Sequence, residues 1–117
     1  EIHLLSSIGG RLDHSLANVF LLTAYHRENC KISLVGPDYI AWMVKKQSVI
    51  IGKPGDYVSI IPLDNQVHGI TMEGFKYPLE NASITRGSTQ GISNELVADK
   101  GLISVKSGSL LTVHTRA

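Results

Sequence analysis

The sequence has 117 residues, of which 43% are hydrophobic and 18% are charged, which suits one compact domain or a small domain with part of a second. A formal net charge of +1 and the lack of any apolar run near the ~20 residues of a membrane span argue against nucleic-acid and membrane partners. The single cysteine, Cys30, excludes an internal disulfide, offers no zinc spacing and fits a cytoplasmic protein.

The first 36 residues have a pattern that is typical of an α/β layer. Residues 1–10 have no basic leader and no initial methionine, and they resemble the end of a strand that enters a glycine loop. Apolar or small residues recur at helical spacing over 15–29, on a face broad enough to predict burial on more than one side. Residues 30–36 then predict a short buried strand. We therefore expect strand, loop, helix and strand in this order, in a chain that begins inside a longer protein.

The stretch GGRLDHSLAN, residues 9–18, has two interpretations. In the simpler one, two glycines form a turn and Asp13 or Ser15 caps the helix. In the other, the free amides of the helix N-terminus bind an anion beside Arg11, and Asp13 holds Mg²⁺ or a substrate hydroxyl. The residues alone leave both interpretations open.

After Pro37 the pattern changes to short β-rich runs separated by turn residues about every ten positions. This spacing predicts an antiparallel sandwich or barrel. The last two runs predict a hairpin with a three-residue loop at 107–109, in which Val105 pairs with Leu111 and Gly108 or Ser109 is left-handed. The predicted strands cover 39–44, 48–51, 57–63, 66–72, 83–85, 91–97, 102–106 and 110–115.

Two further stretches carry polar or aromatic side chains. RGSTQGISNEL, residues 86–96, is either a connecting loop or a hydrogen-bonding edge for a heteroaromatic ring through Ser93 and Asn94. Phe75 and Tyr77 alternate as in a half-buried strand that Pro78 ends, and the favoured interpretation of the stretch 69–81 is a structural corner. Trp42 could stack on a ligand, but in an apolar run such as 40–44 it is expected in the core. His3, His26, His68 and His114 are scattered without the spacing of metal ligands.

Four motifs, GGRLDHSLAN, GITMEGFKYPLEN, GSTQGISNEL and ISVKSGSLLTV, occur in the order and approximate spacing of the thiamine pyrophosphokinase family. The sequence resembles the C-terminal part of that family over nearly its whole length. The resemblance implies that 1–37 are the C-terminal piece of an α/β ATP-binding domain and that 38–117 are a thiamine-binding antiparallel β-sandwich. It also implies a homodimer that transfers pyrophosphate from ATP to the hydroxyl of thiamine, with Mg²⁺, and forms thiamine diphosphate and AMP.

The resemblance also suggests roles for individual residues. Arg11 and Asp13 fall at the catalytic turn, with Asp13 facing the metal. Ser93 and Asn94 fall at the segment that contacts the thiamine pyrimidine. Tyr77 and Gly87 are expected to be structural. The nucleotide-binding set is Gly10, Arg11, His14 and Asn18.

One feature of the family is missing from this sequence. The acidic metal-binding loop of the family lies upstream of the Gly-Gly-Arg turn, and no such loop precedes Gly9 here. Because metal-assisted charge neutralisation is central to phosphoryl transfer, we expect this chain to be inactive by itself. The alternative is a non-catalytic β-sandwich that binds a small heterocycle or serves in dimer assembly.

Overall fold

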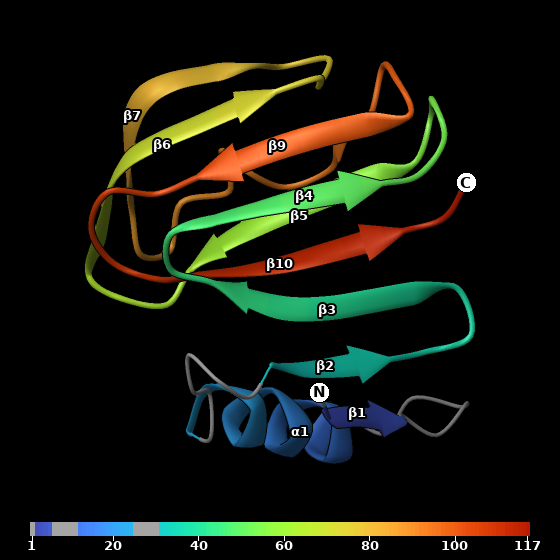
Figure 1. Cartoon of the computed structure of the whole chain (residues 1–117). Helices are drawn as coiled ribbons and strands as arrows, with labels where there is room; N and C mark the ends of the chain where they lie inside the picture. The colour runs from blue at the N-terminus through green and yellow to red at the C-terminus, as the bar shows by residue number, and fades with distance from the viewer. Residues whose placement is uncertain (1, 6–11, 25–30) are drawn as a thin grey trace.

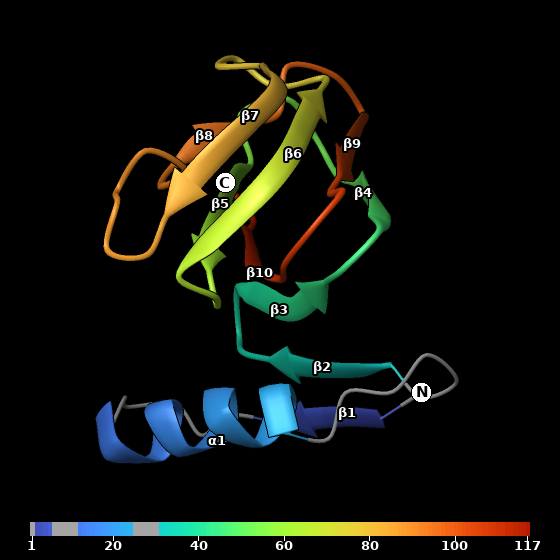
Figure 2. The same ribbon diagram turned by 90° about the vertical axis from the view of Figure 1, so that its left-hand side faces the viewer.

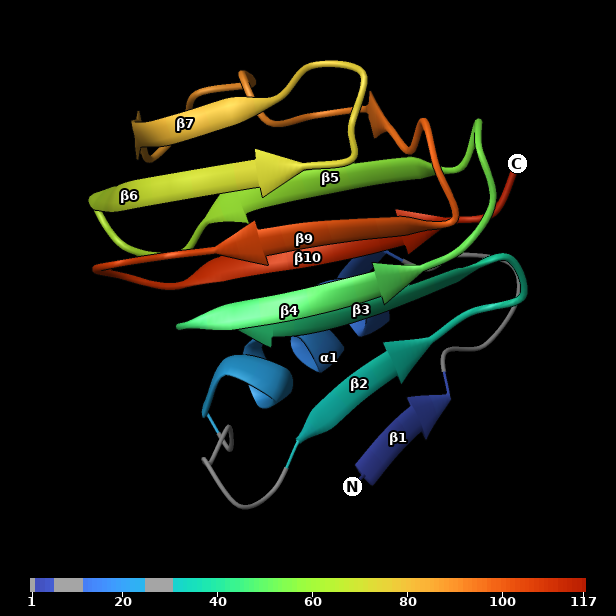
Figure 3. The same ribbon diagram turned by 45° about the horizontal axis from the view of Figure 1, so that its top comes forward.

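Two β-sheets packed face to face form most of the molecule, and one helix lies outside them (Figure 1). The computed structural model describes residues 2–5, 12–24 and 31–117. In Figure 3 the four-stranded sheet lies in front of the larger sheet. Its strand order is β4 (Gln47–Ile51), β9 (Lys100–Ser104), β6 (Gln66–Glu73) and β7 (Leu79–Thr85).

The second sheet has six strands and extends beyond the first. Every pair in it is antiparallel except the parallel pair formed by its first two strands. Its order is β1 (Ile2–Leu5), β2 (Ile32–Val35), β3 (Tyr39–Val44), β10 (Leu110–Thr115), β5 (Tyr57–Pro62) and β8 (Asn94–Glu95).

The predicted antiparallel sandwich is confirmed, and alternation along the strands explains it. In β5, Val58 and Ile60 are buried between the sheets, whereas Tyr57 and Ile61 are exposed on the outer face. The main core between the sheets is formed by Val44, Ile50, Val58, Ile60, Val67, Ile70, Met72, Phe75, Ile84, Leu96, Ile103, Val105 and Leu110. Trp42 packs against this core, in agreement with its predicted place.

Thr112 is a polar exception in the middle of β10. Its side chain is fully buried, and its Oγ1 has no hydrogen-bond partner in the described part of the chain. A buried hydroxyl without a partner is destabilising, so Thr112→Val is expected to raise the free energy of unfolding by about 1 kcal/mol. Urea denaturation would measure this gain, with the partly exposed Thr115→Val as the matched control. A loss of stability at Thr112 alone would contradict the expectation.

The predicted C-terminal hairpin is wrong. Strands β9 and β10 belong to different sheets, and Ser104 pairs with Gln47 and Thr71 rather than with β10. Residues 105–109 instead cross between the sheets, where the Val105 N–H donates to the Lys46 carbonyl at 2.7 Å. Each strand buries apolar residues against its own neighbours, and the same apolar residues would also suit a hairpin. Gly108 does have a positive φ of 95°, as the turn residues predicted.

Two other predicted strands are shorter or absent. Within 91–97 only Asn94–Glu95 is a strand, and 74–78 form the connection between β6 and β7. Phe75 is buried and makes a single β-bridge with Leu96, while Tyr77 is 60% exposed. Gly74, at φ +88°, turns the chain ahead of them, so the aromatic alternation arises from a folded connection rather than from a strand.

Helix α1 (Leu12–Ala24) lies on the outer face of the six-stranded sheet. Figure 2 shows it beside β1 and β2, away from the four-stranded sheet. Leu22 is fully buried and, with Val19, packs in a second cluster that includes Met43 and Leu111. In the described part of the chain no helix is long and apolar enough to cross a membrane.

The helix differs from its prediction at its start and in its buried face. Asp13 and Ser15 lie inside α1, so neither is the cap that the sequence suggested. The predicted burial on more than one side is also wrong, because Leu16 and Phe20 are 47% and 68% exposed and Leu22 is the only buried residue of the described helix. Helical periodicity indicates that one side of the helix is apolar, but it does not indicate how much of that side the neighbouring strands cover. The remaining predicted helical residues, 25–29, and Cys30 lie outside the described residues.

Strands β1 and β2 with α1 between them have the connectivity of a βαβ unit. The expected strand, helix and strand are therefore present in the expected order. Strand β2 in turn pairs with β3, with Ser33 opposite Trp42. The proposed division after residue 37 thus falls between two neighbouring strands of one sheet.

Candidate functional site

The outer face of the six-stranded sheet is only partly covered by α1. Leu111 packs in the cluster under α1 and lies opposite Ile61 in the β10–β5 register, so both side chains are on the same face. Alternation places Tyr57 and Ser59 on this face too. Tyr57 and Ile61 are 46% and 37% exposed, so the part of the sheet formed by β5 is open to solvent.

Ser93 joins this open part of the face. Its backbone N–H donates to Ser59 Oγ at 2.9 Å, and its residue is exposed. Ser93 also has a φ of +59°, a left-handed conformation that costs a non-glycine residue about 1–2 kcal/mol. Strained residues of this kind gather at functional sites. We call Tyr57, Ser59, Ile61 and Ser93 the edge patch: two hydroxyls between apolar side chains.

Asn94 lies behind the edge patch and is nearly fully buried, at 5% exposed. Its Oδ1 accepts from the backbone N–H groups of Tyr77 and Glu95, at 3.0 and 2.9 Å. Its Nδ2 donates to the Tyr77 carbonyl at 2.8 Å. The amide therefore holds the 74–78 connection against β8 and fixes the turn that contains Ser93. Tyr77 is structural through its backbone, while Gly87 has a positive φ of 87° in a turn.

The residues predicted at the nucleotide turn fall on or before α1. Gly10 and Arg11 lie outside the described residues. Asp13 is in the first turn of the helix, where its Oδ1 accepts from the His14 N–H at 2.9 Å. Its negative charge there is favourable to the helix dipole. His14 and Asn18 are four residues apart and share a side of the helix. Helix α1, which carries Asp13, His14 and Asn18, and the edge patch lie on one face of the same sheet.

A magnesium ion would need more ligands than this part of the chain supplies. The described residues contain no group of three or more His, Cys, Asp or Glu that could hold a metal ion. Mg²⁺ requires near-octahedral oxygen coordination, and Asp13 offers one carboxylate. The described residues alone do not form the implied metal site.

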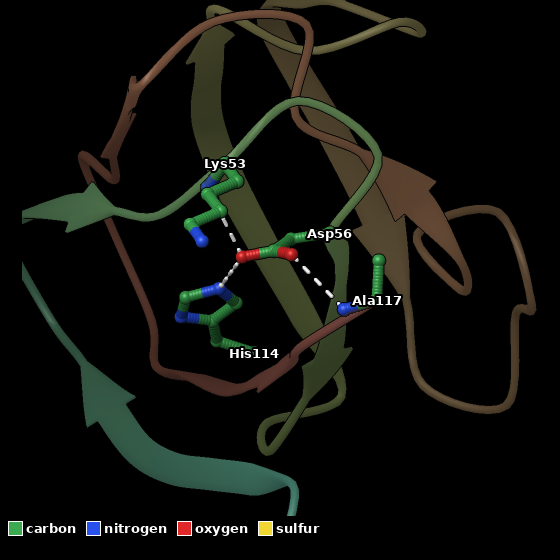
Figure 4. A network of polar contacts seen from close by, with 4 residues as sticks. All are labelled: Lys53, Asp56, His114 and Ala117. Carbon is green, nitrogen blue, oxygen red and sulfur yellow. Dashed lines mark hydrogen bonds and ion pairs between the residues drawn. The ribbon is translucent and has the colours of Figure 1, made fainter.

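One polar network escaped the sequence analysis (Figure 4). The buried carboxylate of Asp56 is 2.8 Å from His114 Nε2 and accepts from the backbone N–H groups of Ala117 and Lys53, at 3.0 and 3.1 Å. The Ala117 and His114 hydrogen bonds lower the pKa of Asp56 from 3.8 to about 2. A Cβ on Gly52 would lie 2.6 Å from Asp56 Oδ2, so glycine is needed there.

Sequence separation explains why this network was missed. Asp56 and His114 are 58 residues apart, and His114 was one of several scattered histidines. The close glycines around Asp56 were the only local signal, and they are also ordinary turn residues. The network connects the turn before β5 to the chain beyond β10.

These features define a β-sandwich of two mainly antiparallel sheets with a βαβ unit on the larger one, and solved structures share this arrangement. The thiamine pyrophosphokinase structure from Bacillus subtilis superposes with a TM-score of 0.89 at 36% identity, covering 99% of this chain and 55% of that one. The thiamin pyrophosphokinase structure from Geobacillus thermodenitrificans has a TM-score of 0.85 at 36% identity, covering 99% of this chain and 54% of that one.

Sequence comparison establishes the family. The family model described as "Thiamin pyrophosphokinase, vitamin B1 binding domain" matches residues 44–110, and the chain belongs to this family. The thiamine pyrophosphokinase of Bacillus subtilis is 38% identical over 116 residues, which are 97% of this chain and 54% of the relative. Thiamine pyrophosphokinase 1 of Oryza sativa is 26% identical over 120 residues, 98% of this chain and 45% of the relative. The resemblance is confirmed, and the chain spans about half the length of these relatives.

Proposed function

We propose that this chain is the thiamine-binding part of a thiamine pyrophosphokinase. The longer protein would transfer pyrophosphate from ATP to the hydroxyl of thiamine and release thiamine diphosphate and AMP. The observation that carries this proposal is the family match over 44–110, which includes the strained Ser93 turn and the whole edge patch. The relatives' names supply the reaction.

The edge patch is the proposed thiamine site. Tyr57 and Ile61 offer apolar surface to a ring, and the hydroxyls of Ser59 and Ser93 offer donors and acceptors beside it. Asn94 has its amide bonded to Tyr77 and Glu95, so in this proposal its main role is to position Ser93. The pyrimidine contact itself rests on the resemblance.

The proposed nucleotide-binding site is formed by the polar residues around the start of α1. Gly10, Arg11, His14 and Asn18 would face ATP, and Asp13 would supply one oxygen ligand to Mg²⁺. Residues 1–37 would then belong to an ATP-binding α/β domain and 38–117 to the thiamine-binding sandwich. The support is the βαβ connectivity and the position of α1 on the same sheet face as the edge patch. We also propose that the longer protein is a homodimer and that it is cytoplasmic.

Catalysis would then depend on positioning. A bond forms between the thiamine oxygen and the β-phosphorus of ATP, and the bond from that phosphorus to the α-phosphate bridging oxygen breaks. The hydroxyl proton leaves to solvent and AMP departs with the bridging oxygen. Fixing the hydroxyl in line with the phosphorus supplies much of the rate of such a reaction.

Calorimetric titration and AMP release test the proposed function. Thiamine should bind both to this chain and to the longer protein, and only the longer protein should release AMP from ATP at a useful rate. Full activity of this chain alone would contradict the proposal that catalysis also needs the rest of the longer protein. No thiamine binding by either protein would overturn the thiamine site.

Ser93→Ala is expected to weaken thiamine binding about tenfold, because a polar group of the bound ring loses its partner. The bond from the residue 93 N–H to Ser59 is unchanged by this substitution, so the fold should keep its stability. Calorimetry in the longer protein measures the dissociation constant, with the exposed Ser88→Ala as control. If the variant and the native protein bind thiamine with equal affinity, the Ser93 hydroxyl is not part of the thiamine site.

Asp13→Asn in the longer protein is expected to lower kcat at least about tenfold and to leave the thiamine dissociation constant within about twofold, as for a residue that acts on the nucleotide side. Initial rates of AMP release and thiamine calorimetry measure the two quantities. Asp38→Asn, at an exposed carboxylate between β2 and β3, is the control. An unchanged kcat would exclude Asp13 from the mechanism.

A further inference from the structure

A cavity of about 640 Å³ lies between β4 of the smaller sheet and β2 and β3 of the larger one. Its volume is within the range of small-molecule sites. In the six-stranded sheet β2 and β3 lie on one side of β10, whereas β5 and β8, which carry the edge patch, lie on the other. The cavity is therefore separate from the proposed thiamine site, and nothing in the proposed reaction uses it.

His114 lines this cavity with an oriented imidazole. Its side chain is only 10% exposed, and Nε2 is 2.8 Å from Asp56 Oδ2. A carboxylate accepts hydrogen bonds and cannot donate them, so Nε2 is the donor of this bond, and in the neutral imidazole Nδ1 is the acceptor. Figure 4 shows this second nitrogen pointing away from Asp56. Among the described residues the Asp56 bond is the only one found for the ring. The cavity is therefore lined by a nearly buried imidazole whose Nε2 is engaged by Asp56 and whose Nδ1 is the nitrogen left for a ligand.

The wall beside His114 is apolar and partly aromatic. Ile40 lies next to His114 in the β3–β10 register, and Trp42 follows two residues later on the same face. Trp42 Nε1 donates to Ser48 Oγ of β4 at 3.0 Å, a bond that joins the two sheets across this region and holds the indole in place. A planar ligand can pack on such a wall.

The charge of the cavity is positive. Lys31, Lys45 and Lys46 belong to its lining, and none of the described residues that line it is acidic. These lysine residues are exposed, so they stand where the cavity meets solvent. A ligand with an anionic group is favoured by this charge.

We propose that the cavity binds a small planar aromatic anion whose ring carries an N–H or O–H donor. The donor bonds to His114 Nδ1, the ring packs beside Trp42 and Ile40, and the anionic group lies among the lysine side chains.

Three related probes test the proposal on the natural full-length protein. Indole-3-acetate has the ring, the N–H and the carboxylate; 1-methylindole-3-acetate lacks the N–H; indole-3-ethanol lacks the charge. Indole-3-acetate should bind with a sub-millimolar dissociation constant and shift the His114 Nδ1 resonance in ¹⁵N NMR spectra. Each of the other probes should bind about tenfold more weakly, the loss expected for one hydrogen bond or charge contact. Equal affinity for the methylated probe, or an unmoved His114 resonance, would overturn the proposal.

Two variants and a competition complete the test. Lys45→Glu, at an exposed residue of the lining, should weaken indole-3-acetate about tenfold, while Lys100→Glu, outside the lining, should not. Equal effects of the two substitutions would contradict a site at this cavity. Saturating thiamine should leave indole-3-acetate bound. Displacement by thiamine would show that the probe occupies the thiamine site, and it would contradict a separate site at the cavity. This outcome would leave the proposed reaction untouched.

Discussion

Asp56→Asn is expected to lower the free energy of unfolding by about 3 kcal/mol, as for a buried carboxylate that loses hydrogen bonds to its charged form. The carboxylate receives three hydrogen bonds, from His114 and from the backbone N–H groups of Lys53 and Ala117. An asparagine amide has one acceptor atom and turns an N–H₂ group toward one of these donors. Urea denaturation measures the loss, with the exposed Asp99→Asn as the matched control. A difference of less than about 1 kcal/mol between the two variants would contradict the structural role of the network.

The same carboxylate predicts a pH dependence. Its pKa is about 2 in the folded protein and 3.8 without these bonds, so the folded state favours the ionised form. The stabilisation is therefore present above about pH 4 and is lost as the pH falls toward 2. The melting temperature of the native protein should fall more steeply over this interval than that of Asp56→Asn. Parallel curves for the two proteins would show that Asp56 does not titrate in this way.

Asn94→Ala is the second large effect that we expect, at about 3 kcal/mol of lost stability. The substitution removes the partner of the N–H and carbonyl of Tyr77 and of the N–H of Glu95, three bonds in a partly buried place. Thiamine binding should weaken as well, because the turn at Ser93 loses its support. Denaturation and thiamine calorimetry in the longer protein measure both effects.

Ser93→Ala provides the comparison for Asn94. It removes a hydroxyl from the same turn but keeps the backbone bond to Ser59, so its stability should stay within about 0.5 kcal/mol of the native protein. If Asn94→Ala weakens thiamine binding without any loss of stability, Asn94 contacts the ligand instead of positioning the turn.

The strands were predictable from the sequence because alternation and turn residues are local signals. The predicted run 39–44 matches β3, and 110–115 matches β10. Strand partners are not local, and so the pairing of Val105 with Leu111 was wrong although both residues are buried. The helix was also predictable, but its buried side depends on Met43 and Leu111, which are distant in sequence.

The candidate site divides in the same way. Ser93 and Asn94 were named from the motif alone, whereas the bond of Ser93 to Ser59 joins residues 34 positions apart and needs the fold. The Asp56–His114 pair joins residues 58 positions apart and could likewise be identified only from the fold. Sequence reasoning identified polar groups that stand near one another in the chain, and it could not identify those that only the sandwich brings together.

The position of β10 has a consequence for the synthesis of the protein. This strand is the last one that the structure describes, yet it lies inside the six-stranded sheet between β3 and β5. Until β10 has been synthesised, β3 and β5 each present an unpaired edge, and such edges are open to pairing with other chains. The larger sheet can close only after residue 115 has left the ribosome, so this part of the fold should form after the four-stranded sheet. Chaperone demand should then fall on the interval between the synthesis of β5 and the insertion of β10.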